Sequence, residues 1–86
     1  MNKQKLETIK KYLSSYTCAR SVLYNANEDT NLEEELGICE INKIDIVNLL
    51  ERLSKKEVSV NEIYKMDTIG ELGLLFDKYE INYYLD

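Results

Sequence analysis

The segment from Ile41 to Leu53, "INKIDIVNLLERL", constrains the fold more than any other part of the chain. Its large apolar side chains recur at spacings of three and four, which is the period of an α-helix. They are Ile41, Ile44, Ile46, Val47, Leu49, Leu50 and Leu53. The solvent side is narrower and is traced by Asn42, Asp45, Asn48 and Arg52. The pattern predicts a central helix over about 40–55, with other segments packed around it.

The length of the chain limits what can surround this helix. A domain of 86 residues buries only about 60–65% of its unfolded surface, which leaves room for one modest core and not for a deep enclosed active site. The composition, 44% apolar and 31% charged, is that of a globular domain. We therefore expect a single domain over 1–86.

A first helix is predicted over about 3–19, where Leu6, Ile9, Leu13 and Tyr16 form one apolar stripe. The following "NANEDTN", at 25–31, is rich in Asn and Asp and lacks large apolar side chains, so it is typical of a loop. We expect the longest loop to lie between residues 19 and 32 and the first helix to pack on the central one.

Helix start signals recur further along the chain. Three pairs have the Ser/Thr-x-x-Glu spacing of a capping box: Thr30 with Glu33, Ser59 with Glu62, and Thr68 with Glu71. The first pair predicts a short turn that places Leu32 and Leu36 inward and ends at a left-handed Gly37. The second predicts a short helix that ends near Met66.

The third pair predicts a final helix. Its inner face consists of Ile69, Leu72, Leu75, Phe76 and Tyr79. Gly70 and Gly73 each weaken this helix by about 1 kcal/mol relative to alanine, but such small residues let another helix approach it closely. The pattern does not decide the conformation of the tail, 80–86.

The net charge is −5, from 11 basic and 16 acidic residues. This acidity argues against nucleic-acid binding, which needs clustered lysine and arginine, and it fits a basic protein partner. No apolar run approaches the length of a membrane span or a signal peptide. Two cysteines are too few for a disulfide scaffold. We therefore expect a monomeric, cytoplasmic protein that binds neither nucleic acid nor membrane.

The chain contains no histidine, which excludes His-based acid–base catalysis, Ser-His and Cys-His nucleophiles and ordinary zinc sites. Neither a phosphate-binding glycine loop nor a dinucleotide fingerprint is present. We therefore expect a binding protein that is not an enzyme and has no catalytic residue, no metal site and no cofactor.

Three stretches of the chain resemble the acyl and peptidyl carrier proteins of fatty-acid, polyketide and nonribosomal peptide synthesis. They are "LEEELG" at 32–37, "INKIDIVNLL" at 41–50 and "VSVNEIYKMDTIGEL" at 58–72. They are similar to the family's Leu-Gly lead-in, to the helix after its attachment site, and to the region from its short third helix into its fourth. The resemblance covers about 6–79. It implies an all-α four-helix bundle of the acyl carrier protein type, with a short third helix and a long loop between helices one and two.

The attachment serine of that family is missing. In carriers, Leu-Gly is followed by a variable residue and then by Asp-Ser, and the serine hydroxyl carries phosphopantetheine. Here Cys39 stands at the aspartate position and Glu40 at the serine position. A carboxylate cannot form the phosphodiester, and no Ser or Thr lies between Asn31 and Leu53. The resemblance therefore implies a carrier-like domain to which phosphopantetheine is not attached.

Glu40 has three interpretations. An acid in the first turn of a helix interacts favourably with the helix dipole, by about 0.3–1 kcal/mol. Its fixed negative charge also stands where a modified carrier holds a phosphate, so an Arg or Lys of a partner could read it. The third interpretation is an engineered change at this position, which the sequence alone does not distinguish from a natural glutamate.

The cysteines and tyrosines have structural interpretations. Cys39 is interpreted as a small half-buried residue, because the surrounding acids disfavour a thiolate, and Cys18 as a core or boundary residue. Tyr16, Tyr64 and Tyr79 fall on or beside inward stripes. The adjacent tyrosines at 83 and 84 cannot both face inward, so the tail is a second candidate contact site.

The resemblance also indicates where a partner would bind. In carriers this surface is built from the loop before the central helix and from that helix's first turns. The corresponding residues are Ile38, Cys39, Glu40, Ile41, Lys43 and Ile44. Apolar side chains with a charged rim are expected of a small contact patch. The alternative is that Ile41 and Ile44 only complete the core.

Three functions follow. The first is a protein-interaction module associated with acyl or peptidyl assembly enzymes. The second is a working carrier with non-standard attachment, or an engineered attachment-site variant. The third is a small helical adaptor unrelated to carriers.

Overall fold

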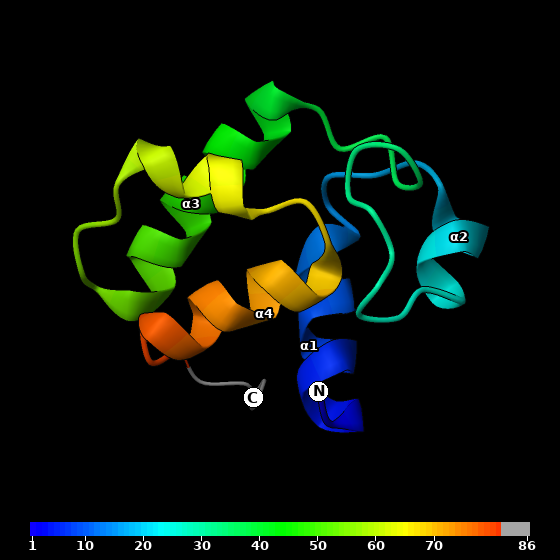
Figure 1. The fold of residues 1–86 in the computed structure, drawn as a ribbon, viewed down its shortest axis with the longest axis horizontal. Coiled ribbons are helices and arrows are strands. Elements are labelled where there is room, and N and C mark those ends of the chain that lie inside the picture. The colour runs from blue at the N-terminus through cyan, green and yellow to red at the C-terminus, as the bar shows by residue number, and fades with distance from the viewer. Residues whose placement is uncertain (82–86) are drawn as a thin grey trace.

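The computed structural model describes residues 1–81 and is all-α over that range. Five helices follow one another: α1 (Lys3–Leu13), α2 (Arg20–Tyr24), α3 (Glu40–Ser54), the 3₁₀ helix η1 (Val60–Lys65) and α4 (Ile69–Lys78). Within residues 1–81 there is no β-sheet, and the one isolated bridge joins Asn31 and Thr68. Figure 1 shows α3 and η1 on one side of the molecule, α1 beside α4, and α2 at the far edge.

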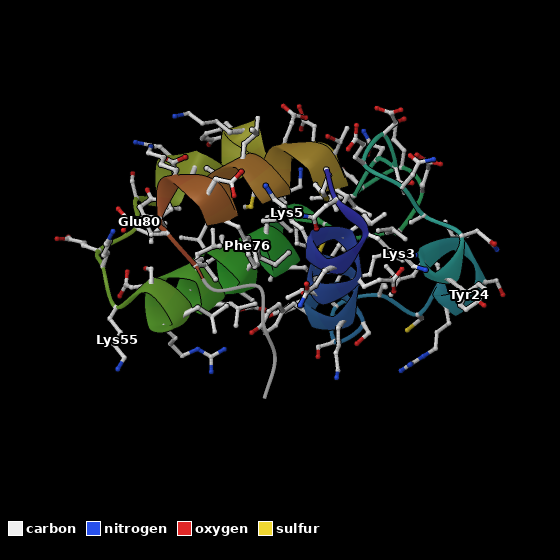
Figure 2. The ribbon with its side chains drawn as sticks, turned by 90° about the horizontal axis from the view of Figure 1, so that it is seen from below. Lys3, Lys5, Tyr24, Lys55, Phe76 and Glu80 are labelled. Atoms are coloured by element: carbon white, nitrogen blue, oxygen red, sulfur yellow. The ribbon has the colours of Figure 1, made fainter. Side chains whose placement is uncertain are left out.

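The first helix packs on the last one. Ile9 of α1 lies against Gly73 of α4, where an added Cβ would be 3.4 Å from the Ile9 Cδ1 atom. The rings of Tyr12 and Phe76 lie 6.0 Å apart, and Figure 2 places Phe76 in the middle of the molecule. The first helix was predicted to pack on the central one; in the structure α1 packs chiefly on α4, and α3 packs chiefly on η1. Because Gly73 has no side chain, α1 can approach α4 closely at this point.

The central helix has the predicted bounds. It ends at Ser54, where Lys55 adopts the left-handed conformation (φ 57°) as the C-cap. Its buried face carries Ile46, Val47, Leu49 and Leu50. Leu53 is half-buried against the same core.

The first helix is shorter than predicted. It ends at Leu13 because Ser14 caps it and the Ser14 hydroxyl donates to the carbonyl of Lys11 (2.6 Å). The chain then turns away, and the buried Thr17 hydroxyl donates to the Leu36 carbonyl. The predicted helix over 14–19 is therefore absent.

The predicted long loop contains the extra helix α2. Leu23 anchors α2 in the core. The ammonium of Lys10, a buried residue of α1, donates to the carbonyls of Tyr24 (2.7 Å) and Ala26 (3.3 Å). A cation at the carbonyl end of a helix is favourable, so Lys10 fixes α2 against α1.

The segment before α3 is capped by Asn31 and not by the predicted Thr30. The Asn31 side-chain oxygen accepts from the N–H groups of Glu33 (2.9 Å) and Glu34 (2.8 Å). The Thr30 hydroxyl instead accepts from the N–H of Asn27. Gly37 has the predicted left-handed conformation, with φ +67°.

The loop before α3 is fastened to the start of α4. The N–H of Leu32 donates to the Asp67 carbonyl (2.8 Å), and the N–H of Gly70 donates to the Glu28 carbonyl (2.8 Å). An added Cβ at Gly70 would lie 3.0 Å from that Glu28 oxygen. The predicted close approach of another helix is therefore confirmed at Gly73, which faces α1, whereas Gly70 faces this loop.

The two later capping boxes have different outcomes. Thr68 and Glu71 form the predicted reciprocal box at the start of α4. Ser59 caps η1 by accepting from the N–H of Asn61. Glu62, however, is buried and accepts a 2.8 Å hydrogen bond from the Lys78 ammonium of α4. The second half of the Ser59 box is therefore wrong, because Glu62 joins η1 to α4.

The stability of the η1–α4 junction should depend on pH through Glu62. The hydrogen bond from Lys78 lowers the pKa of the Glu62 carboxyl below its usual value. A carboxyl with a lowered folded-state pKa contributes stability above its unfolded pKa of about 4.3 and loses it as the pH falls through the folded pKa. We expect Glu62→Gln to reduce the acid-side fall in stability, as measured by urea unfolding at pH 7, 5, 4 and 3. Equal acid-side slopes in parent and variant would contradict this assignment.

Within residues 1–81, no helix is both long enough and apolar enough to cross a membrane.

Candidate functional site

The six residues predicted to contact a partner divide into a buried pair and an exposed group. Ile38 is 0% exposed and Lys43 is 6% exposed, so neither is on the surface and their assignment to an exposed patch is corrected. Ile41 is 72% exposed and Ile44 is 39% exposed. The alternative that these two isoleucines complete the core is therefore wrong. Cys39 and Glu40 are exposed beside them.

Ile38 is buried because the backbone before α3 is held in place. The N–H of Gly37 donates to the Glu33 carbonyl (3.0 Å), and the N–H of Ile38 donates to the Leu32 carbonyl (2.9 Å). These bonds fold 32–38 into a closed turn, so the side chains of Leu32, Leu36 and Ile38 all enter the core. The turn fixes the point at which α3 begins.

Glu40 is the first residue of α3, and Cys39 is its N-cap. The Asn42 side-chain oxygen accepts from both the Cys39 N–H (3.3 Å) and the Cys39 S–H (3.1 Å). Glu40 is exposed and lies in the first turn, where a negative charge is favoured by the unpaired N–H groups of the helix end. The helix thus begins without a serine, threonine or aspartate cap.

The two cysteines lie on the surface, contrary to prediction. Cys39 and Cys18 are both free thiols with exposed side chains. Cys39 is exposed at the N-terminal end of α3, where its S–H donates to the Asn42 side chain. Cys18 is exposed because α1 ends before it, so the helical stripe that would have placed it near the core does not extend to it.

Lys43 lies beneath this site and neutralises acids from two other segments. Its Nζ atom is 3.9 Å from a carboxylate oxygen of Glu33 and 3.7 Å from one of Asp67. The lysine stem is buried against the core while its charge faces the two acids. Lys43 therefore connects α3 to the loop before it and to the loop before α4.

A hollow of about 260 Å³ lies between the start of α3 and η1. Its lining residues are Glu33, Glu40, Lys43, Ile63, Tyr64 and Asp67. Tyr64, which the sequence placed inward, is 71% exposed at this hollow. The sequence does contain a signal for this exposure. Ile63 and Met66 are buried and three residues apart, so they define the inner face of η1 and leave position 64 on its outer face.

The surface that results is apolar and has an acidic rim. We call it the α3 face and define it as Glu40, Ile41, Ile44 and Tyr64. Ile41 and Ile44 are three residues apart and Glu40 and Ile44 are four apart, so all three lie on one side of the helix. Figure 1 shows η1, which carries Tyr64, alongside α3. Among residues 1–81 no group of three or more acids or cysteines could hold a metal ion.

The second candidate contact site, the tyrosines at 83 and 84, lies outside the described residues. Of the other tyrosines placed inward, Tyr16 and Tyr79 are half-buried against the core.

Comparisons of the chain with protein families, with curated proteins and with solved structures found no match.

Proposed function

We propose that this chain is a carrier-like domain without the phosphopantetheine serine, and that it acts by binding another protein through the α3 face. In this proposal the fold is the four-helix arrangement of acyl carrier proteins. The four carrier helices correspond, in chain order, to α1, α3, η1 and α4. The short helix α2 is an addition within the long loop. The partner is an enzyme of acyl or peptidyl assembly.

The observation that carries the proposal is the position of Glu40. The attachment residue of the family begins the helix after the Leu-Gly turn, and here that place belongs to an exposed carboxylate at the first residue of α3. The turn before it is closed by Gly37 in its left-handed conformation. In this proposal the position of the attachment residue is kept while its reactive hydroxyl is absent.

The α3 face also supports a binding role. Ile41 and Tyr64 each expose more than two thirds of their surface, and a large apolar side chain that the fold leaves in water is available to a partner. Exposed acids lie beside them: Glu33, Glu40 and Asp67 line the same hollow as Tyr64, and Asp45 follows Ile44 in α3. A complementary partner surface has an apolar centre with a Lys/Arg rim.

A capture experiment tests this proposal. We expect immobilised parent protein to capture an assembly enzyme from the lysate of its native host and Ile41→Asp/Ile44→Asp to capture at least about tenfold less, because two charges would be placed in the apolar centre. Captured proteins are quantified by mass spectrometry at low and at high salt.

The matched control is Val22→Asp/Leu74→Asp, which makes the same change in charge at two other exposed apolar residues. Both double variants should keep the parent's circular dichroism spectrum. Equal capture by the parent and the Ile41/Ile44 variant, or equal loss in the control, would rule out the α3 face as the interface.

A further inference from the structure

A groove of about 620 Å³ lies between α1 and α2 and shares no residue with the α3 face. Its lining residues are Glu7, Lys10, Lys11, Arg20, Leu23 and Tyr24. Small-molecule sites in proteins occupy about 300–1,000 Å³ and combine apolar walls with a few fixed polar groups. The groove has this size and composition, although neither the sequence motifs nor the proposed function uses it.

The charge of the groove is opposite to that of the protein. Lys10, Lys11 and Arg20 contribute three positive charges and Glu7 one negative charge, so the lining carries +2, whereas the whole chain carries −5. The remaining residues therefore carry −7. A local excess of positive charge on an acidic protein selects an anion at this place and repels it elsewhere.

The cations differ in how firmly they are placed. The Lys10 ammonium is fixed by the carbonyls of Tyr24 and Ala26, and its distance to the Glu7 carboxylate is 3.8 Å. Lys11 and Arg20 are exposed at the groove. A buried, hydrogen-bonded ammonium beside two exposed cations gives an anion one pre-organised partner and two partners at the surface.

The apolar part of the groove comes from α2. Leu23 is buried in the core, whereas Tyr24 is 82% exposed. Figure 2 shows Tyr24 on α2 at the outer edge of the molecule. An aromatic ring left in water beside three cations offers a face against which a flat apolar group can stack.

We propose that the α1–α2 groove binds a phosphate monoester on a flat apolar body. A phosphate monoester carries about −1.5 to −2 charges at pH 7, which balances the +2 of the lining. The phosphate lies among Lys10, Lys11 and Arg20, and the apolar body lies against Tyr24. A carboxylate provides only half of that charge and binds more weakly.

The experiment is a titration of the ¹⁵N-labelled protein followed by NMR at pH 7.5 and low salt, with four probes. The probes are phenyl phosphate, benzoate, inorganic phosphate and phenol. We expect saturable shifts at Lys11, Arg20 and Tyr24 with phenyl phosphate, at a dissociation constant of about 1 mM or below, as is reasonable for so small a ligand. The other three probes should each bind at least about fivefold more weakly. Equal binding of phenyl phosphate and inorganic phosphate, or shifts spread over all the lysines, would overturn the proposal.

Variants test the two halves of the site separately. Lys11→Glu/Arg20→Glu should weaken phenyl phosphate at least about tenfold, whereas Lys56→Glu/Arg52→Glu, with the same charge change at the other end of the molecule, should change it less than about threefold. Tyr24→Ala should reduce the affinity for phenyl phosphate to that for inorganic phosphate. Because the Tyr24 ring is exposed and Lys10 contacts its backbone carbonyl, this variant keeps the fold and tests the site even if the double variant unfolds. Unchanged phenyl phosphate binding in Tyr24→Ala would contradict the proposed pose.

Discussion

Ile38→Asp should destabilise this domain by at least about 4 kcal/mol, whereas Ile41→Asp, the same change three residues later, should leave its stability nearly unchanged. Ile38 is fully buried in the core beside Leu32 and Leu36. Replacing it removes a large apolar side chain and places a carboxylate in the solvent-excluded apolar core, which together cost at least about 4 kcal/mol. A domain of this size has a free energy of unfolding of only about 5–10 kcal/mol, so a large part of its stability is lost.

Ile41→Asp provides the matched control. Ile41 is largely exposed, and an acid in the first turn of α3 is favoured by the helix dipole, so its free energy of unfolding should change by about 0.5 kcal/mol or less. Urea unfolding followed by circular dichroism measures both variants. A folded Ile38→Asp with nearly parental stability would show that this side chain is not in the core, and the α3 face would then have to be extended to Ile38.

The difference between Ile38 and Ile41 shows where periodicity is informative and where it is not. Spacings of three and four predicted the bounds of α3 correctly, because an α-helix returns to one face at those intervals. They did not show that α3 has apolar side chains on two faces. Ile41 and Ile44 share the solvent face with Asp45, Asn48 and Arg52, all exposed. A chain of 86 residues has too little material to cover both faces.

Lys43 shows that the periodicity of a helix predicts burial but does not identify the contacts of a buried residue. Its spacing to Ile46, Val47 and Leu50 is three, four and seven, so it lies in the middle of the buried face. A lysine at that position looks exposed if only its charge is considered. The acids that stabilise it, Glu33 and Asp67, are ten residues before and twenty-four residues after it in the chain. The spacing of apolar residues within α3 therefore predicts that Lys43 is buried, but it does not identify Glu33 and Asp67 as the acids that bind it.

Local chemistry predicted some turns and failed at others for an identifiable reason. Gly37 and the Thr68–Glu71 box were correct because each depends on backbone geometry within a few residues. The Ser59–Glu62 box was half wrong because Lys78, sixteen residues away, binds Glu62. The helix α2 was missed for the same kind of reason, since the Lys10 side chain of α1 binds the carbonyl of its last residue, Tyr24, and that of Ala26 just beyond it.

The second large effect is expected at Glu40. The parent should remain unmodified when it is incubated with coenzyme A and a promiscuous phosphopantetheinyl transferase, because the attachment position has no hydroxyl. Glu40→Ser should gain the mass of one phosphopantetheine arm in the intact-mass spectrum, since it places a hydroxyl at the exposed first residue of α3. Losing the acid costs the helix only about 0.3–1 kcal/mol, so the fold that presents the serine is kept.

Two further variants show whether position and surroundings both matter. Cys39→Asp/Glu40→Ser restores the Asp-Ser pair of the family and also supplies a better N-cap than cysteine, so its modification should be faster than that of Glu40→Ser alone. Asp45→Ser places a hydroxyl on the exposed side of the same helix, one and a half turns further on, and should gain nothing. A parent protein that accepts the arm would refute the loss of attachment at Glu40. The double variant could also stay unmodified while it remains folded. The start of α3 would then lack the surface that a transferase recognises. The carrier-like proposal would fail, because the chain would share only the order of its helices with the family.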